Sequence, residues 1–353
     1  MPHTTMPPVA GMICALTYIH RSSGCRLPIQ ADSPERQGNK WEDPPVMKAL
    51  WLSVRNVAVA FLCMIAAPGH AGDNPMDAAA GLRAKYDALR DQLDNSSFNK
   101  PLRLDSSESR NSVAGEIHAL IDHPFATVAG ALSSAGDWCG ILFLHLNTKY
   151  CRPTSGSQGI ILNVGIGKKH DQPVDKAYRV VFVYRVAAQS ANYLQARLNA
   201  DQGPLSTRDY RIVLEAVPVN RDRTFIRLSY SYTFGAVGRL AMGAYLGTIG
   251  KSKVGFTVTG RGANGQPQYI GGVRGVLERN VLRYFLAIEA HLGALSVPPL
   301  ARLEKRLRDW FAAAERYPRQ LHEIDLDEYL VMKRREAARQ DDASNFPTSV
   351  HLP

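Results

Sequence analysis

Cysteine is scarce in this chain, and the sequence lacks the short motifs that mark several large enzyme classes. Only five of its 353 residues are cysteine. No G-x-S-x-G turn occurs, which removes support for an α/β-hydrolase. No H-E-x-x-H pattern occurs, which removes support for a zinc protease. The sequence therefore presents no ready-made catalytic centre.

A long hydrophobic run is also absent near the N-terminus. The apolar run Val57–Ala67 has eleven residues, against the ~20 that a spanning helix needs. Lys48 and Arg55 come before or near its start, and small residues follow it up to Ala71. This layout predicts a secretory signal peptide over residues 47–71, cleaved near Ala71. No cysteine stands at the cleavage point, so we do not expect a lipid anchor.

Residues 1–46 precede this segment and show neither a helical nor a strand period. We interpret them as a start-site artefact, with translation beginning at Met47. The alternative is a disordered extension ahead of a signal anchor.

Dense blocks of one charge are missing as well. The net charge is +10, and it is +8 for residues 72–353, because the removed part holds six basic and four acidic residues. The longest basic runs are Lys168-Lys169 and Lys333–Arg335. This favours a solvated basic surface and no nucleic-acid partner, while contact with an anionic membrane surface or an envelope protein stays open.

Export leaves two cysteines, Cys139 and Cys151, at the ends of the segment WCGILFLHLNTKYC. In an oxidising compartment such a pair favours a disulfide over a catalytic thiol or a metal site. The alternative is two buried free thiols. A bridge here would hold the segment after Trp138 in a tight excursion and contribute about 3 kcal/mol.

Hydrophobic periodicity predicts helices at both ends and strands between them. The glycine motif GRGANG (Gly260–Gly265) is followed by QPQYIGG, which does not open a helix, so it predicts a hairpin turn and not a dinucleotide site. The predicted helices are Met76–Leu93, one led by Pro124, Arg239–Ile249, Val273–Leu295, Leu300–Tyr317 and Leu326–Arg339. The predicted strands are Ser112–Asp122, Gly159–Lys168, Tyr178–Ala187, Asn192–Leu198, Asp209–Val219 and Thr224–Phe234.

This order resembles the helix-grip fold of the START-like (SRPBCC) superfamily. The likeness is carried by the strand that runs into Asp122-His123-Pro124, by Trp138 after it, and by the amphipathic helix from Val273. The resemblance implies an α+β fold in which a curved antiparallel sheet wraps a long C-terminal amphipathic helix, with additional N- and C-terminal helices. It also implies an apolar cavity that holds a lipid, sterol or polyketide.

The expected organisation follows from these assignments. We expect residues 72–100 to form an N-terminal helix and residues 101–295 to form the START-like domain. We expect a helical extension over 296–340 and a flexible tail over 341–353.

The candidate ligand-binding residues lie on one strand and on the long helix. Tyrosines that alternate with serines in LSYSY either face the cavity or face outward. A Glu–Arg pair on the helix could orient a polar ligand end or act as acid and base, or it could be a salt bridge with Glu215 or Arg227. The candidates are Tyr230, Tyr232, Glu278, Asn280, Arg283 and Tyr284.

Histidines invite a metal hypothesis, which the sequence does not favour. Glu116 and His118 would share a strand face and His123 lies at the turn beyond, but no second cluster supports a metal site. We interpret these as surface or turn groups and His145 as a satisfied, half-buried residue. We expect no metal and no cofactor.

The sequence thus favours an exported, periplasmic or secreted, carrier of a lipid or other hydrophobic ligand, without catalysis. One alternative is an enzyme of the same fold, a cyclase or hydratase acting on a hydrophobic substrate. Another is a structural envelope protein whose cavity is filled by side chains.

Overall fold

The computed structural model describes residues 75–157, 159–236, 238–240, 243 and 253–340. The expected signal peptide, residues 1–46, the tail over 341–353 and most of the expected helix over 239–249 lie outside these residues.

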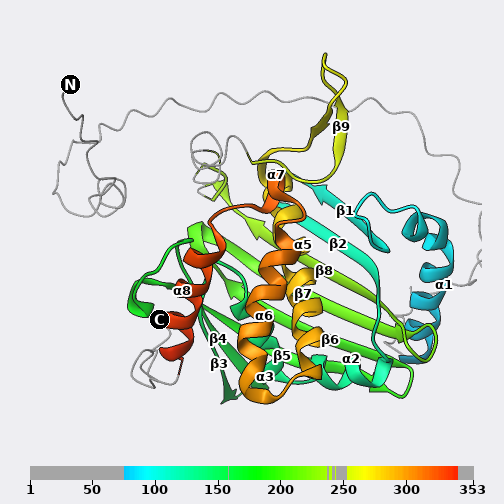
Figure 1. The fold of residues 1–353 in the computed structure, drawn as a ribbon, viewed down its shortest axis with the longest axis horizontal. Coiled ribbons are helices and arrows are strands. Elements are labelled where there is room, and N and C mark those ends of the chain that lie inside the picture. Colours follow the sequence, from blue (N-terminus) through cyan, green and yellow to red (C-terminus); the bar gives the residue numbers. More distant parts are fainter. Residues whose placement is uncertain (1–74, 158, 237, 241–242, 244–252, 341–353) are drawn as a thin grey trace, which may run out of the picture. The chain divides into compact units, whose positions relative to one another are not determined.

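The centre of the fold is one antiparallel sheet of eight strands, in the order β1-β2-β8-β7-β6-β5-β4-β3 (Figure 1). Successive strands from β3 to β8 pair with their neighbours in the chain, which is the meander that the short turns predict. The strands are β1 (Leu102–Glu108), β2 (Ser112–Ile121), β3 (Thr148–Gly156), β4 (Gly159–Ile166), β5 (Tyr178–Ser190), β6 (Tyr193–Gln202), β7 (Thr207–Pro218) and β8 (Thr224–Phe234).

Two strands are present that the sequence did not indicate, and they form the two edges of the sheet. β1 is mostly polar and only partly buried. β3 contains Pro153, and its second half is exposed. An edge strand tolerates proline and needs no continuous apolar face. Neither segment therefore shows the alternation of apolar and polar residues that indicates an inner strand.

The long helix α5 (Gly272–Gly293) lies on the inner face of the sheet and contacts β1, β2 and β8. Its fully buried side chains include Leu277, Phe285 and Ile288, and burying each such side chain contributes about 1.5–3 kcal/mol. A Cβ at Gly115 of β2 would lie 2.9 Å from Leu277 Cδ2, so this glycine lets the helix approach the strand. The α+β helix-grip arrangement expected from the sequence is confirmed.

Two short helices precede β3 on the same side. α2 (Phe125–Leu132) follows Pro124 as predicted, and α3 (Ala135–Phe143) holds Trp138 and Cys139. The Trp138 Nε1–H donates to Leu132 O at 2.8 Å, which joins the two helices.

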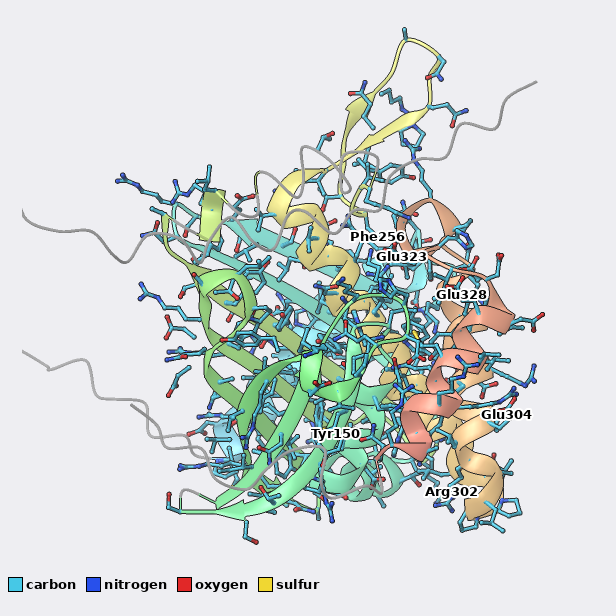
Figure 2. The ribbon with its side chains drawn as sticks, turned by 90° about the vertical axis from the view of Figure 1, so that its left-hand side faces the viewer. Tyr150, Phe256, Arg302, Glu304, Glu323 and Glu328 are labelled. Atoms are coloured by element: carbon cyan, nitrogen blue, oxygen red, sulfur yellow. A yellow bond between two sulfur atoms is a disulfide. The ribbon has the colours of Figure 1, made fainter. Side chains whose placement is uncertain are left out.

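The C-terminal helices form a further layer on the side of α5 away from the sheet (Figure 2). They are α6 (Pro299–Ala314), α7 (Pro318–Leu321) and α8 (Leu326–Ala338). Trp310 of α6 stacks on Tyr329 of α8 with ring centroids 5.2 Å apart, and Trp310 Nε1–H donates to Arg283 O. These contacts attach the extension to α5.

Helix α1 (Pro75–Asp94) packs on the outer face of the sheet. Its Leu82, Leu89 and Leu93 are buried in a separate apolar cluster, where the ring centroid of Tyr86 lies 5.2 Å from that of Phe225 of β8. The sheet therefore carries helices on both faces.

The predicted hairpin is a two-stranded sheet of its own, β9 (Val258–Arg261) and β10 (Pro267–Tyr269). Gly265 has φ 74° in the turn, a conformation that favours glycine. No helix of the described residues is both long and apolar enough to cross a membrane.

Candidate functional site

The inner face of the sheet carries a cluster of tyrosines beneath α5. Tyr230 and Tyr232 both turn inward from β8 and are 6% and 5% exposed, which answers the question that the LSYSY pattern left open. Tyr284 of α5 meets Tyr230 edge-on at 5.6 Å, and Tyr210 of β7 stacks on Tyr232 at 5.3 Å. We call Tyr210, Tyr230, Tyr232 and Tyr284 the tyrosine cluster.

The hydroxyl groups of this cluster are mostly unpaired. Tyr210 shares a hydrogen bond with Thr207 Oγ1 at 2.6 Å, but Tyr230, Tyr232 and Tyr284 have no hydroxyl partner among the described residues. Desolvation raises the pKa of all four phenols, to about 12 for Tyr210. They are neutral near pH 7, and each hydroxyl can donate one hydrogen bond.

His145 joins this cluster, with its ring centroid 5.5 Å from that of Tyr284. Its Nδ1 accepts from the Asn147 N–H, whereas its Nε2 is buried without a hydrogen-bond partner. Burial lowers the pKa of His145 well below 6.5. The neutral ring with Nδ1 as acceptor carries its proton on Nε2. The side chain is 6% exposed, so it is buried and not half-buried as expected.

Asn280, another predicted site residue, interacts with the side chain of His145 in a way that opposes the lowering of the pKa of His145 by burial. It therefore belongs with the tyrosine cluster. The sequence could not have placed His145 there, because the segment after Trp138 has no period that fixes its orientation.

Glu278 lies elsewhere and is saturated by protein donors. Its carboxylate accepts from the N–H groups of Phe256 and Thr257, at 2.5 and 2.9 Å, and from the Thr257 hydroxyl at 2.6 Å. Ser106 of β1 also donates to it. Glu278 thus fastens the base of the β9–β10 hairpin to the long helix.

Arg283 faces a different neighbour again. Its Nη2 lies 2.9 Å from Glu323 Oε1 and donates to Leu321 O. Glu278 and Arg283 therefore do not form the pair considered from the sequence. Glu215 and Arg227, the proposed salt-bridge partners, pair with each other at 2.7 Å on the outer face of the sheet.

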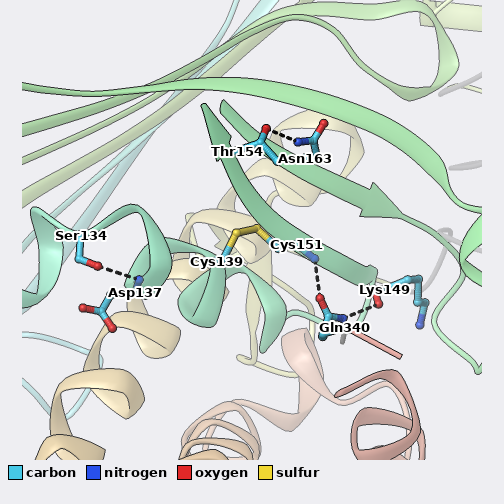
Figure 3. The surroundings of a disulfide bond; sticks show 8 residues. All are labelled: Ser134, Asp137, Cys139, Lys149, Cys151, Thr154, Asn163 and Gln340. Atoms are coloured by element: carbon cyan, nitrogen blue, oxygen red, sulfur yellow. Dashed lines mark hydrogen bonds between the residues drawn. A yellow bond between two sulfur atoms is a disulfide. The ribbon is translucent and has the colours of Figure 1, made fainter. Parts of the chain in front are cut away.

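The predicted disulfide is present and joins α3 to the edge strand β3 (Figure 3). The Cys139 and Cys151 Cα atoms are 5.2 Å apart. The Cys151 N–H donates to Gln340 Oε1 at 3.0 Å, and Gln340 Nε2 donates to Lys149 O. The chain just after α8 is therefore held against β3 beside the disulfide.

The outer face of the sheet carries two pockets that are lined by described residues. Their volumes are about 350 and 540 Å³. Within those residues no group of three or more His, Cys, Asp or Glu side chains is placed to hold a metal ion. The tyrosine cluster offers neutral hydroxyl groups that can donate hydrogen bonds to a bound group.

No protein-family model matches the chain, and no curated protein matches it. Solved structures that resemble it include a conserved protein from Geobacillus kaustophilus, with 12% identity over 52% of this chain and 95% of that one, at a TM-score of 0.30. Truncated norcoclaurine synthase from Thalictrum flavum has 12% identity over 41% of this chain and 91% of its own, at 0.29. Human StAR-related lipid transfer protein 5 has 6% identity over 49% and 90%, at 0.27. The chain's own strand order and long helix give it the START-like helix-grip arrangement that the sequence resembles.

Proposed function

We propose that this protein is an exported binding or carrier protein for a hydrophobic ligand held between the inner face of the sheet and α5. The observation that carries the proposal is the gathering of polar groups at one place in the main core. Tyr230 and His145 both pack on Tyr284, and His145 Nε2 is buried without a hydrogen-bond partner among the described residues. The hydroxyls of Tyr230, Tyr232 and Tyr284 lie in the same cluster. A ligand that accepts hydrogen bonds from them offsets their desolvation.

The character of these donors sets the class of ligand. All four are neutral near pH 7, and the surroundings are the apolar side chains of the main core. A lipid, sterol or similar molecule with a neutral carbonyl or hydroxyl group fits this combination. The basic balance of residues 72–353 suits delivery to or from an anionic membrane surface.

Native mass spectrometry of the protein purified from the periplasm, followed by organic extraction, tests the proposal. We expect a stoichiometric hydrophobic ligand. The double variant Tyr230→Phe/Tyr284→Phe removes two hydroxyls with almost no change of volume. Its affinity for the ligand should be lower by a factor of about ten or more, because each lost hydrogen bond contributes about 1 kcal/mol. Tyr178→Phe, at an exposed tyrosine of β5, is the matched control and should retain it.

A second candidate, a structural envelope protein, is favoured by the continuity of the main core, which includes Trp138, Phe285 and Trp310 at 1% exposure or less. Wild-type protein that is empty and neither extracts nor takes up lipid would support this candidate against the carrier. The enzyme alternative is weaker, because the carboxylate of Glu278 is already occupied by protein donors.

A further inference from the structure

The outer face of the sheet holds a polar depression that the proposed carrier function does not use. The pockets of about 350 and 540 Å³ share Glu215 of β7 and Arg227 of β8, so they adjoin, and we call them together the outer trough. One end lies against α1, and the other runs along β6, β7 and β8.

Helix α1 borders the first pocket with one face. Ala78, Gly81, Leu82 and Lys85 line it at the spacing i, i+3, i+4 and i+7. A Cβ built on Gly81 would have no neighbouring atom within 4 Å. The short side chains at 78 and 81 therefore leave the space beside the sheet open.

His118 lines the same pocket from β2 and is only 1% exposed. Neither of its ring nitrogens has a hydrogen-bond partner, although Nε2 lies 3.3 Å from Glu116 Oε1. Burial lowers the pKa of His118 to about 4, so the ring is neutral and offers one donor and one acceptor. Two buried ring nitrogens without a hydrogen-bond partner among the described residues are rare in folded proteins and mark this ring as a candidate for contact with a water or a bound molecule.

The charged groups around His118 are held in place by the protein. Arg227 lies 2.5 Å from Glu116 Oε2 and 2.7 Å from Glu215 Oε2, and the Tyr193 hydroxyl donates to Glu215 at 2.6 Å. Lys85 has no ion pair within the described part of the chain, and it lies close enough to lower the pKa of His118. The pocket thus presents an ammonium group, a neutral imidazole and a carboxylate oxygen.

We propose that the outer trough binds a small polar molecule that carries a carboxylate next to a hydroxyl or ammonium group, such as an amino acid or an α-hydroxy acid. The carboxylate would pair with Lys85, and the neighbouring hydroxyl or ammonium would donate to His118 and to Glu116 Oε1. A polyanion fits less well, because Glu116 and Glu215 would repel it. The pocket volume is that of a small-ligand site.

The proposed contacts are separate from those of the carrier function, because the first pocket is lined by α1 and by residues of β2, β7 and β8 that are not part of the tyrosine cluster. The second pocket also reaches Tyr210 of that cluster. In this proposal Glu116 and His118 bind a small organic molecule and not the metal ion that was considered from the sequence. These two residues share the outer face of β2 as the sequence predicts, and the third contribution comes from Lys85 of α1.

Ligand-observed NMR on the intact protein tests the proposal, with amino acids and α-hydroxy acids as probes and the corresponding amines and alcohols as carboxylate-free controls. We expect at least one acid to bind wild type and its carboxylate-free counterpart not to bind. Gly81→Phe fills the open space beside α1 and should abolish binding. Gly130→Phe, at an exposed glycine of α2 that also has open space around it, is the matched control and should bind normally.

Lys85→Met should lower the affinity for the acid at least about tenfold, because it removes the charged hydrogen bond to the carboxylate. Far-UV circular dichroism checks that each variant is folded. Failure of every acid to bind wild type at millimolar concentration would overturn the proposal. Equal binding to the Gly81→Phe and Gly130→Phe variants would overturn it as well.

Discussion

At the scale of single residues, the disulfide between Cys139 and Cys151 links helix α3 to the edge strand β3. Cys139 and Cys151 are the only cysteines after residue 71, and each is buried against the main core. Replacing both by alanine should lower the free energy of unfolding by about 3 kcal/mol, since the denatured chain is no longer cross-linked. Chemical denaturation with tryptophan fluorescence measures this.

Reductant provides the control for the disulfide. It should destabilise wild type to about the level of the Cys139→Ala/Cys151→Ala variant and leave that variant unchanged. A double variant as stable as oxidised wild type would show that the bridge contributes nothing to stability.

Other residues at this scale could not be placed from the sequence. In LSYSY the alternation shows that two tyrosines share a face, but a register shift of one residue moves them to the other face. Only the pairing of β8 with β2 and β7 fixes them inward. Likewise, Glu278 and Arg283 are five positions apart on one helix, yet their partners come from β1 and from the chain after α7.

At the scale of elements, α8 is attached to β3 through buried charges. Lys149 and Lys333 lie 2.8 and 2.9 Å from the two carboxylate oxygens of Glu336, and all three side chains are fully buried. Two ammonium groups share one carboxylate, and Lys333 also donates to Thr148 O. Desolvation lowers the pKa of Lys333 to about 8.

This burial predicts a stability that rises with pH. Between about pH 8 and the ordinary lysine pKa of 10.5, the unfolded chain binds a proton at Lys333 that the folded chain does not. The free energy of unfolding should therefore increase by about 1–2 kcal/mol from about pH 8 to about pH 9.5, before tyrosines begin to titrate in the unfolded chain. Urea denaturation across this range measures it.

Lys333→Met should remove most of this rise in the free energy of unfolding. One ammonium group, that of Lys149, then remains for the one carboxylate of Glu336, so the buried charges cancel. Lys149 and Lys169 also have lowered pKa values and contribute with the same sign. Lys168→Met, at an exposed neighbour of Lys169, should keep the wild-type slope. An equal slope in the Lys333→Met variant would contradict the assignment.

At the scale of the whole molecule, periodicity predicted the inner strands and the long helix, because each buries one continuous apolar face. The edge strands β1 and β3 escaped prediction, since neither needs such a face. Three tyrosines of the tyrosine cluster were among the predicted site residues, whereas the outer trough was not predicted at all. The outer trough combines α1 and β2 with β7 and β8, which lie more than a hundred residues from α1 in the sequence, and only the pairing of β2, β8 and β7 brings them together.

Export is the remaining prediction at this scale, and it ties the signal-like segment to the disulfide. Expressed in a bacterium with a periplasm, the full sequence should yield a periplasmic protein whose N-terminus is Gly72, because the residues before it have the layout of a cleaved signal. A chain that starts at Met47 should give the same product.

Placing a charge in the apolar run, as in Phe61→Arg, should leave the protein in the reducing cytosol without the bridge between Cys139 and Cys151. Intact-mass spectrometry of each fraction, with and without thiol alkylation, reads out the cleavage and the disulfide together. Uncleaved wild-type protein in the cytosol with two alkylated thiols would contradict export. It would also show that Cys139 and Cys151 remain free thiols, because the protein does not reach an oxidising compartment.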